Sequence, residues 1–549
     1  MAPTKSKVLR LPSLRAPLDL LFLLCCVVLT AFVLVPEIWG NGKTKDYPLW
    51  YWAGQQVLQG NNLYPTDGGP FAFIYPPLSA VLLAIPSWFG KIPLYICLSI
   101  INAVAWWVTL LYCHAMAGSG RTPDKWLFAL PAIATITFVF DMFDLGQPNL
   151  VLLALMLYGF WSMQHGRPWM AGGMFALASV LKVFPVTVLP YLLWRRQWAA
   201  VASMVLFAGV LLFVVPAPVR GFQHNVAELK TWYQGMIASS SEKGFGQRDD
   251  QNWSWINQSI IAVTHRLTRP INYNQDDPIR PARTMNIVDI SFRAANWLVV
   301  AISLAIGIGY IAVLPKESHR TARSDAEELG ILFCLMTVAS PLARQYYFLW
   351  LIFPITVMMH RGAYDPRPRV RLWSWLVLLA MGLLMCLSFG IFPKDMQAFG
   401  NNLAATAVLA GGLVWHILHP PKEAGGADLT FAAHSPQLLH ANVKSNAPRA
   451  PFSSWICHRN YRQRNVAAAR HLPECLGLAK SRESLGRTVT QLFDLCLLIS
   501  NDEPRGKRAL STLLLRQPLR AIGNDIGEER LMRDDVVEFA KAILQLHQR

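Results

Sequence analysis

The stretch LDLLFLLCCVVLTAFVLVP, residues 18–36, is soon followed by KDYPLWYWAGQQVLQGNNLYP, residues 45–65. The first stretch is almost wholly apolar and long enough to cross a bilayer as a helix, which takes roughly 20 residues. Basic residues precede it, as in a secretory signal, but no small-residue cleavage site ends it. We therefore predict a retained anchor with a cytosolic N-terminus. An acid, Asp46, then stands where the chain leaves the membrane.

The composition predicts a membrane protein throughout. Of 549 residues 53% are hydrophobic and only 15% are charged, and the mean hydropathy is +0.30. The net charge of +17 would suit a nucleic-acid-binding protein, but the basic residues fall in short clusters between apolar runs, as the positive-inside rule expects. We therefore expect no nucleic acid partner and predict an all-α polytopic protein in contact with membrane lipid.

Apolar runs recur as far as residue 420. Measured against the length of roughly 20 residues that one crossing needs, they predict about twelve spans with both termini on one side. The runs are residues 18–36, 94–115, 126–140, 150–163, 170–181, 183–194, 198–217, 294–314, 329–342, 346–359, 372–392 and 403–418.

The basic clusters all fall on the N-terminal side of this threading, so we predict that they lie in cytosolic loops. Two long loops, 37–93 and 219–291, then lie on the extracytoplasmic side. Long polar loops of this kind usually carry function. Short turns at 141–149, 340–347 and 393–402 share that side.

Two stretches fit this threading poorly. Residues 75–89 are apolar but short and bounded by prolines, and counting them as a span would place the later basic loops outside. We expect a re-entrant or interfacial segment there. Residues 170–194 have basic residues at both ends, which two short helices turning near Lys182 would explain.

The composition changes after Pro420. Residues 421–549 are polar, with Arg-rich segments and short apolar patches. We therefore predict two parts: a transmembrane domain over residues 1–420, and a cytosolic tail over residues 421–549 that is partly helical or disordered.

Asp46 is the first candidate for chemistry, because it is an isolated carboxylate between a span and an expected helix. In that helix Leu49, Trp52, Ala53 and Val57 recur at helical spacing, so one face can lie along the lipid boundary. Such a helix would hold the carboxylate at the membrane surface. The alternative is a helix N-cap or a solvated loop acid, for which Asp is well suited.

Lys182 is the second candidate. A lysine within an apolar stretch costs roughly 2.5–3.5 kcal/mol on insertion scales unless it reaches water or an anion. A phosphate is a natural partner for such a charge. The alternative is that Lys182 extends to the membrane surface or pairs with an acid such as Asp144.

The short outer turns supply further donors, acceptors and aromatic rings close to the lipid boundary. A sugar or a lipid phosphate could use such groups, although tyrosines are also typical of the interfacial belt of any membrane protein. The residues are Asp144, Gln147, Asn149, Arg344, Gln345, Tyr346 and Tyr347.

Several kinds of chemistry have no support in the sequence. The chain contains no HExxH, P-loop, GxSxG or paired CxxC motif, and its nine cysteines show no metal-type spacing. We therefore expect no metal site and no cofactor.

A series of residues follows a fixed order along the chain. The series is Asp46 with Tyr51, Ala53, Gly60 and Tyr64; Tyr75-Pro76-Pro77-Leu78; Gly146-Gln147 with Asn149; Gly172, Lys182 and Pro185; Asn257-Gln258-Ser259 with Arg266; and Ser340-Pro341 with Tyr346. This series resembles glycosyltransferase family 87 over roughly residues 19–420. It departs from the family at Ala343 and Gln345, near which a Trp and a His are expected.

The resemblance implies a GT-C fold and an inner-membrane enzyme that moves a hexose, above all mannose, from a polyprenyl-phosphate sugar to a glycolipid or glycan hydroxyl outside the cytosol, with inversion. By position Asp46 would be the general base, and Lys182, Arg266 and Arg344 would hold the donor phosphate. The substrate-binding residues would be Tyr51, Tyr64, Tyr75, Gln147, Asn149, Asn257, Gln258 and Tyr346.

Two other functions are compatible with the predicted spans. A carrier or flippase of lipid-linked sugars would also have an even number of spans, and a non-catalytic scaffold could serve cell-envelope assembly. Carriers usually show matched internal repeats, which this sequence lacks, and the long outer loops favour a transferase.

Overall fold

The computed structural model describes residues 16–39, 46–65, 71–118, 124–242, 244–246, 251–274, 281–389 and 393–421. The chain divides into two units, residues 1–436 and 437–549, and every described residue belongs to the first. The predicted cytosolic tail lies outside the described residues apart from residue 421.

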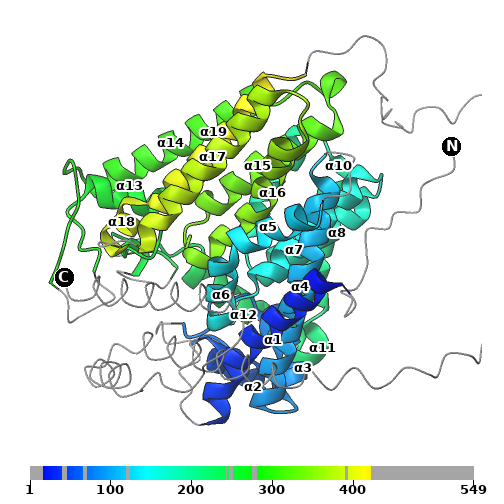
Figure 1. Cartoon of the computed structure of the whole chain (residues 1–549). Helices are drawn as coiled ribbons and strands as arrows, with labels where there is room; N and C mark the ends of the chain where they lie inside the picture. Colours follow the sequence, from blue (N-terminus) through cyan, green and yellow to red (C-terminus); the bar gives the residue numbers. More distant parts are fainter. Residues whose placement is uncertain are drawn as a thin grey trace, which may run out of the picture. The chain divides into compact units, whose positions relative to one another are not determined.

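The described part is built from helices and their connections, and it contains no β-strand. Figure 1 shows the labelled helices. The bounds are α1 Pro17–Ile38, α2 Tyr47–Leu58, α3 Pro77–Ser87, α4 Lys91–Met116, α5 Lys125–Ala134, α6 Ile136–Leu145, α7 Asn149–Gln164, α8 Pro168–Leu181, η1 Phe184–Val188, α9 Leu189–Trp194, α10 Trp198–Gly209, η2 Val210–Val214, α11 Ala217–Arg220, α12 Phe222–Met236, η3 Gln251–Trp253, α13 Ile260–Thr268, α14 Phe292–Val313, η4 Glu317–His319, α15 Ala322–Ala339, η5 Gln345–Leu351, α16 Ile352–Tyr364, α17 Pro368–Cys386, η6 Leu387–Phe389, α18 Pro393–Phe399 and α19 Asn401–Leu418. The η segments are 3₁₀-helices, except the π-helical η2.

Six of the described helical segments are long and apolar enough to cross a membrane, which makes the chain a multi-pass membrane protein. A seventh is gained if α5 and α6, bent by 54° at Thr135, count as one span. The expectation of about twelve spans of roughly 20 residues is therefore not confirmed. The six are α1, α4, the segment from α10 to α11, α14, α17 and α19.

The missing spans have identifiable causes. Helices α7 and α8 have only 16 and 14 residues, which is short of the roughly 20 that a crossing needs. Helix α15 is longer than the run 329–342 because it begins at Ala322, and its first turns include Asp325, Glu327 and Glu328. Hydropathy alone does not predict where these helices begin and end.

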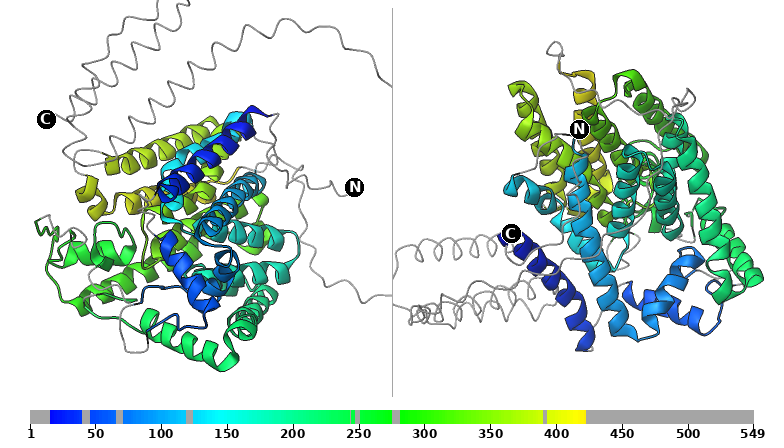
Figure 2. Two further views of the ribbon diagram at one scale, coloured as in Figure 1. Left: turned by 90° about the horizontal axis from the view of Figure 1, so that it is seen from below. Right: turned by 90° about the vertical axis from the view of Figure 1, so that its right-hand side faces the viewer.

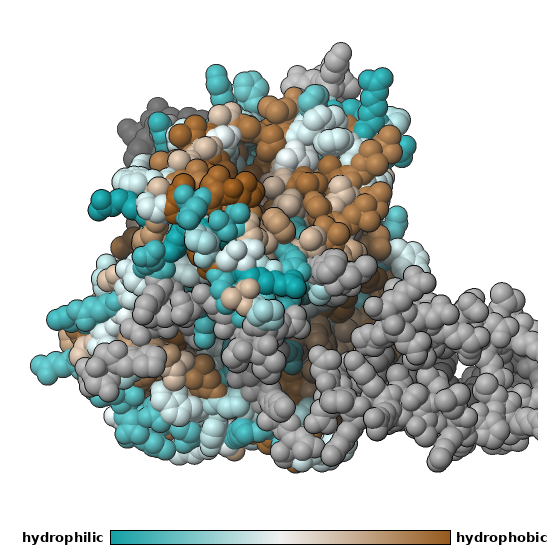
Figure 3. Space-filling view, turned by 90° about the vertical axis from the view of Figure 1, so that its left-hand side faces the viewer, coloured by the Kyte–Doolittle hydropathy of each residue, from teal (hydrophilic) through white to brown (hydrophobic). Residues whose placement is uncertain are grey.

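Several of the long helices expose their apolar side chains. In α14 only Ala295 is buried, whereas Leu304 and Ile308 are exposed by 60% and 65%. Figure 3 shows hydrophobic residues over the upper part of one face, with hydrophilic residues along its rim and lower down. Exposed apolar surface on this scale marks contact with lipid or another apolar partner.

The centre of the core is an aromatic cluster from four segments. Phe160 of α7 lies 4.9 Å from Phe175 of α8 and 5.8 Å from Phe333 of α15, which in turn lies 5.6 Å from Trp350 of η5, measured between ring centroids. A methyl group on Gly159 would meet the Phe175 ring at 2.4 Å. Close helix packing therefore requires glycine at this position. Figure 1 shows α7 beside α4 and α8, and Figure 2 gives two further views of the same helices.

Helices α2 and α3 pack tightly against one another after the first span. A methyl group on Gly54 of α2 would lie 2.2 Å from Oγ of Ser87, so only glycine fits here. Ala53 and Val57 are buried at 0% and 3% exposure. The prediction that this face of α2 lies along the lipid boundary is therefore wrong for Ala53 and Val57, which pack against protein, whereas Leu49 and Trp52 are only partly buried.

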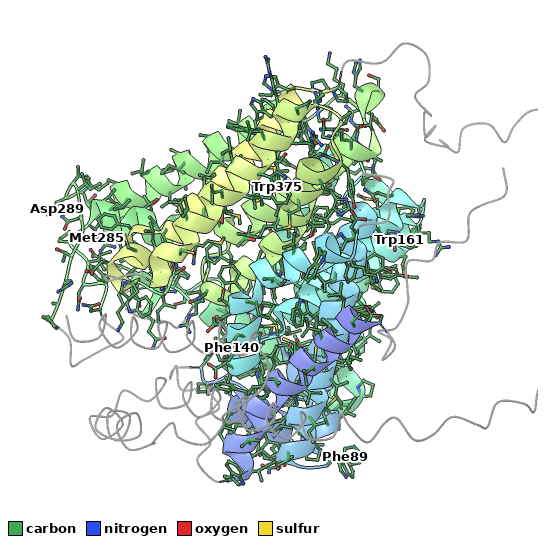
Figure 4. All side chains as sticks on the ribbon, viewed as in Figure 1. Phe89, Phe140, Trp161, Met285, Asp289 and Trp375 are labelled. Carbon is green, nitrogen blue, oxygen red and sulfur yellow. The ribbon has the colours of Figure 1, made fainter. Side chains whose placement is uncertain are left out.

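The two difficult stretches both become short helices. Residues 77–87 form α3, and residues 168–194 form a pair of helical segments that turns at Lys182, whose backbone is extended. The predicted turn near Lys182 is thus confirmed. Figure 4 shows Trp161, near the end of α7, and Phe89, after α3, at opposite ends of this part of the molecule.

The predicted cytosolic loops hold several basic residues in buried ion pairs. Arg195 makes a two-pronged contact with Glu328, and Arg361 Nε donates to Glu327 Oε1 over 2.8 Å. Arg323 Nη1 lies 2.5 Å from Asp365 Oδ2. These pairs tie the ends of α9, α15 and α16 together.

Candidate active site

The candidate site includes a tight turn between helices α6 and α7. Helix α6 ends at Leu145, and the next residue, Gly146, has a left-handed φ of +71°, a conformation that costs other residues free energy. A methyl group there would also lie 2.8 Å from the ring of Tyr47. The Tyr47 hydroxyl donates to the carbonyl of Phe143 over 2.9 Å. The turn is thus fastened to the first residue of α2, next to Asp46.

Gln147 connects the two candidate residues that the sequence singles out. Its Oε1 accepts from Lys182 Nζ and from the Tyr75 hydroxyl, each over 2.9 Å. Lysine can only donate, so the amide oxygen faces Lys182 and the NH₂ group points the other way. Nε2 donates to Asp46 Oδ2 over 2.5 Å. The structure therefore gathers Asp46, Gln147, Lys182 and Tyr75 at one place.

Lys182 lies in a mostly aromatic cage. Its ammonium is 5.6 Å from the ring centroid of Tyr75, 5.0 Å from that of Tyr346 and 4.6 Å from that of Tyr347, within the range of cation–π attraction. It also donates to Asn149 Oδ1 over 3.1 Å. Lys182 is 8% exposed. Its charge is thus held away from water by rings and amide oxygens.

Asn149 is fixed from two sides. Its backbone carbonyl accepts from Trp350 Nε1 over 3.2 Å, and its side-chain oxygen faces Lys182. Among the described residues no acceptor meets its buried Nδ2. This atom is a donor beside the lysine that a substrate oxygen could use.

Arg344 stands at the edge of the same cluster. It and Asp46 both lie within electrostatic range of Lys182 and of Tyr346. Arg344 immediately precedes η5, which carries the two tyrosines of the cage. Burial lowers the pKa of Lys182 to about 7, although Asp46 opposes this shift. The site therefore contains an arginine, a carboxylate and a lysine that titrates near neutral pH, beside a tyrosine pair.

The triplet Asn257-Gln258-Ser259 holds the turn that carries Arg344. Asn257 donates to the carbonyl of Pro341 over 2.9 Å and accepts from the backbone N–H of Ala343 over 3.0 Å. Gln258 N donates to the Ala343 carbonyl over 2.9 Å. These two predicted substrate-binding residues thus lie behind the turn, and their substrate contact stays a prediction.

In the described part of the chain, three other predicted residues have no hydrogen bond to the side chains of Asp46, Gln147 or Lys182. The Tyr64 hydroxyl donates to the Tyr75 carbonyl over 2.5 Å, and burial raises its pKa well above the ordinary value. Tyr51 is half-buried against the α2 and α3 core. Arg266 donates to the carbonyls of Ala398, Trp253 and Ser254.

Arg266 is fully buried, and this burial lowers its pKa to about 9. It therefore stays protonated at neutral pH. Its three bonds to carbonyls tie the backbone of Trp253 and Ser254 to α18. Its predicted role at the donor phosphate has no support from these contacts and stays a prediction.

Tyr47 was not recognised as a site residue from the sequence, and Tyr347 was a candidate of the outer turns that was not among the predicted substrate-binding residues. Tyr47 follows Asp46 directly and is fully buried, and Tyr347 lies closest of the three rings to Lys182. The position of Tyr47 between the carboxylate and Pro48 could have drawn attention to it. Its contact with Gly146 joins residues far apart in the chain and could not be read from the sequence.

Residues 73–341 match the model of glycosyltransferase family 87. This segment belongs to glycosyltransferase family 87. The chain is therefore a membrane glycosyltransferase, and the carrier and scaffold alternatives lose support. The matched residues include Tyr75, Gln147, Asn149 and Lys182, whereas Asp46 lies before them.

Two curated proteins are similar to this glycosyltransferase. Both are described as polyprenol-phosphate-mannose-dependent alpha-(1-2)-phosphatidylinositol pentamannoside mannosyltransferases. The protein of Mycolicibacterium smegmatis is 24% identical over 345 residues, covering 59% of this chain and 70% of the relative. That of Mycobacterium tuberculosis is 24% identical over 336 residues, covering 59% of this chain and 67% of the relative.

Proposed function

We propose that this glycosyltransferase moves mannose from a polyprenyl phosphate to a hydroxyl of a glycolipid, on the extracytoplasmic face of the inner membrane and with inversion at the anomeric carbon. The family and the names of the two relatives support the donor and the kind of acceptor. The observation that carries the assignment of residues is the Gln147 side chain, which joins a carboxylate to a buried lysine.

Asp46 acts as the general base in this proposal. As the acceptor oxygen attacks C1 of the sugar, the bond from C1 to the phosphate oxygen breaks and the hydroxyl proton passes to the carboxylate. The amide of Gln147 holds Oδ2 and leaves Oδ1 for the acceptor hydroxyl. A positioned base of this kind contributes on the order of 100-fold to 10,000-fold to the rate.

Lys182 and Arg344 stabilise the departing phosphate. Their charges offset the negative charge that grows on the phosphate as the bond breaks. Helix α7 begins at Asn149, so the positive end of its dipole adds to the same field. Nδ2 of Asn149 supplies a hydrogen-bond donor at this end.

An apolar groove of about 230 Å³ would take part of the polyprenyl chain. It lies between α9, α14 and α15 and is lined by residues such as Ile306, Leu332 and Met336. Thr187, from the short helix that follows Lys182, also lines it. Burial of apolar chain in such a groove is favourable at roughly 25 cal/mol per Å².

The test is a transfer assay with the full chain in detergent or vesicles. Purified protein receives polyprenyl-phosphate mannose labelled in the sugar and a phosphatidylinositol mannoside acceptor, and labelled glycolipid is measured. Asp46→Asn should lower turnover on the order of 100-fold to 10,000-fold. Asp289→Asn, which removes an exposed acid of the outer loop, is the matched control. Unchanged turnover in Asp46→Asn would refute the assignment of Asp46 as the general base.

A binding measurement distinguishes the proposed role of Lys182 in phosphate binding from the proposed role of Asp46 as general base. Lys182→Met should weaken binding of polyprenyl phosphate, measured as loss of its thermal stabilisation of the protein, while Asp46→Asn should still bind it. Lys316→Met, in an exposed loop, is the control for the lysine. Equal binding by wild type and Lys182→Met would contradict the phosphate role.

A further inference from the structure

Helix α12 packs against the protein through one narrow face. Its buried residues are Asn225, Glu228, Trp232 and Gly235, which recur at spacings of three and four residues and so share one side of the helix. Asn225 Nδ2 donates to the carbonyl of Leu212 over 2.8 Å. This face is the one that fixes α12 to the rest of the chain.

The exposed side of α12 is itself divided into two faces. One is apolar: Phe222, Val226, Tyr233 and Ile237 are exposed by 59%, 37%, 55% and 47% and fall on one stripe at helical spacing. The other is polar or small. It carries the exposed residues Gln223, Ala227, Lys230 and Gln234.

A helix with three such faces suits the boundary between water and lipid. A soluble loop helix has no reason to expose an apolar stripe beside a polar one, and a spanning helix would not carry the polar face. The three faces of α12 therefore match three different surroundings: protein on one side, acyl chains on the second and water on the third.

The apolar stripe of α12 follows directly along the chain on a candidate span whose apolar side chains are mostly exposed. In the most apolar 18 residues of the segment Trp198–Arg220 only 17% of the residues are buried. The last exposed apolar residue of this segment, Val219, is exposed by 56%. Gly221 then takes a left-handed φ of +76° that ends the α11 helix, so the chain can change direction there.

We propose that α12 lies in the headgroup region of the outer leaflet, with Phe222, Val226, Tyr233 and Ile237 sunk among the acyl chains. The partner is the bilayer surface itself. Lys230, at the border between the apolar and polar faces, would reach the lipid phosphates.

Through its buried face α12 also holds the loop that leads to the site. Trp232 Nε1 donates to the carbonyl of Ile74 over 3.0 Å, one residue before Tyr75. Glu228 Oε1 accepts from the backbone N–H of Leu63 over 2.9 Å, and Arg220 binds Glu228 and the Asn61 carbonyl. The inserted helix would thus set the depth of Tyr75 at the membrane surface, a consequence that rests on the proposed function.

The experiment measures depth residue by residue. A fluorescent amino acid is introduced singly at positions 222, 226 and 233 and, as matched controls, at 223, 227 and 234, in the full chain reconstituted into phosphatidylcholine and phosphatidylglycerol vesicles. Quenching by lipids that carry a nitroxide on the acyl chain is compared with quenching by aqueous iodide. The first three positions should respond to the lipid quencher and the controls to iodide.

Two outcomes would overturn the inference. If all six positions respond to iodide, the helix lies in water, and if positions 222, 226 and 233 respond to neither quencher, another protein surface covers the stripe. The measurement needs no transferase activity, so the depth profile and the proposed function can fail independently. If the depth profile agrees with the proposal, the double variant Phe222→Gln and Tyr233→Gln should raise KM for the lipid donor. The control double variant Gln223→Ser and Gln234→Ser should leave KM unchanged.

Discussion

Gln147 donates its side-chain amide to Asp46 across 101 residues of chain. Its amide oxygen at the same time accepts from Lys182. A single neutral side chain therefore sets the distance between the carboxylate and the ammonium of the site, and it keeps them from forming a direct ion pair.

Replacing Gln147 with Ala should lower kcat by about 10-fold to 100-fold, because Asp46 loses the bond that orients it while the carboxylate itself remains. Gln147→Glu should be more damaging, since a second carboxylate cannot donate to Asp46 and would bind Lys182 instead. Steady-state transfer kinetics check both variants. Gln164→Ala, at the exposed end of α7, is the control. A Gln147→Ala enzyme with normal kcat would show that Asp46 needs no positioning.

Gly146 is required for two separable reasons. Gly146→Ala should destabilise the protein by about 2–4 kcal/mol, because alanine is strained at positive φ and its methyl group would overlap the Tyr47 ring. Gly60 has a similar φ of +72° but open space around its Cβ position, so Gly60→Ala should cost only about 1–2 kcal/mol. Thermal unfolding followed by tryptophan fluorescence compares the two. Equal losses would mean that the Tyr47 contact contributes nothing.

Much of the helical structure could be predicted from the sequence, but the number of spans could not. The first apolar run, residues 18–36, is long and uninterrupted, so its helix was evident. The runs near Lys182 and Thr135 have the hydropathy of spans, yet the backbone turns at each. Such breaks depend on packing against other helices, which a hydropathy window does not contain.

The candidate site, too, could be predicted only in part from the sequence. Asp46 could be recognised along the chain as an isolated carboxylate between a span and a helix. Lys182 could be recognised because a charge within an apolar stretch is costly. Their connection through Gln147 could not, since it joins three separate segments. The substrate-binding interpretation of Tyr64 did not anticipate its bond to the Tyr75 carbonyl, which is a matter of how one loop folds on itself.

Asn257 should matter for the shape of the turn before Arg344. Asn257→Ala removes bonds to Pro341 and Ala343 and takes away the acceptor of the Ala343 N–H, a loss of about 1–3 kcal/mol, whereas the Pro341 carbonyl keeps its bond from Ser259 Oγ. The donor KM should rise as well, because Arg344 would lose its fixed position. Asn62→Ala, at an exposed loop position, should change neither quantity. Thermal unfolding measures the stability and transfer kinetics measure the donor KM, on the same preparations. An unchanged KM in Asn257→Ala would show that Asn257 does not position Arg344.

Asp365 supplies a prediction about pH at the predicted cytosolic side. Burial alone would raise the pKa of Asp365, but hydrogen bonds from Arg367 and Arg323 outweigh it and lower the pKa to about 2. Because the folded pKa lies below the ordinary value of about 3.9, the carboxylate stabilises the fold at pH values above about 4. That contribution is lost as the pH falls from about 4 to about 2.

Asp365→Asn should therefore lower the free energy of unfolding at pH 7, and the difference from wild type should shrink as the pH falls through this window. Arg323 and Arg367 would face a neutral amide in the variant and lose their charge-assisted bonds. Thermal unfolding of both proteins between pH 7 and pH 2.5 measures the difference directly, and Asp289→Asn, which changes an exposed acid, is the control. A gap between wild type and Asp365→Asn that stays constant over this range would mean that the ionised carboxylate does not stabilise the fold.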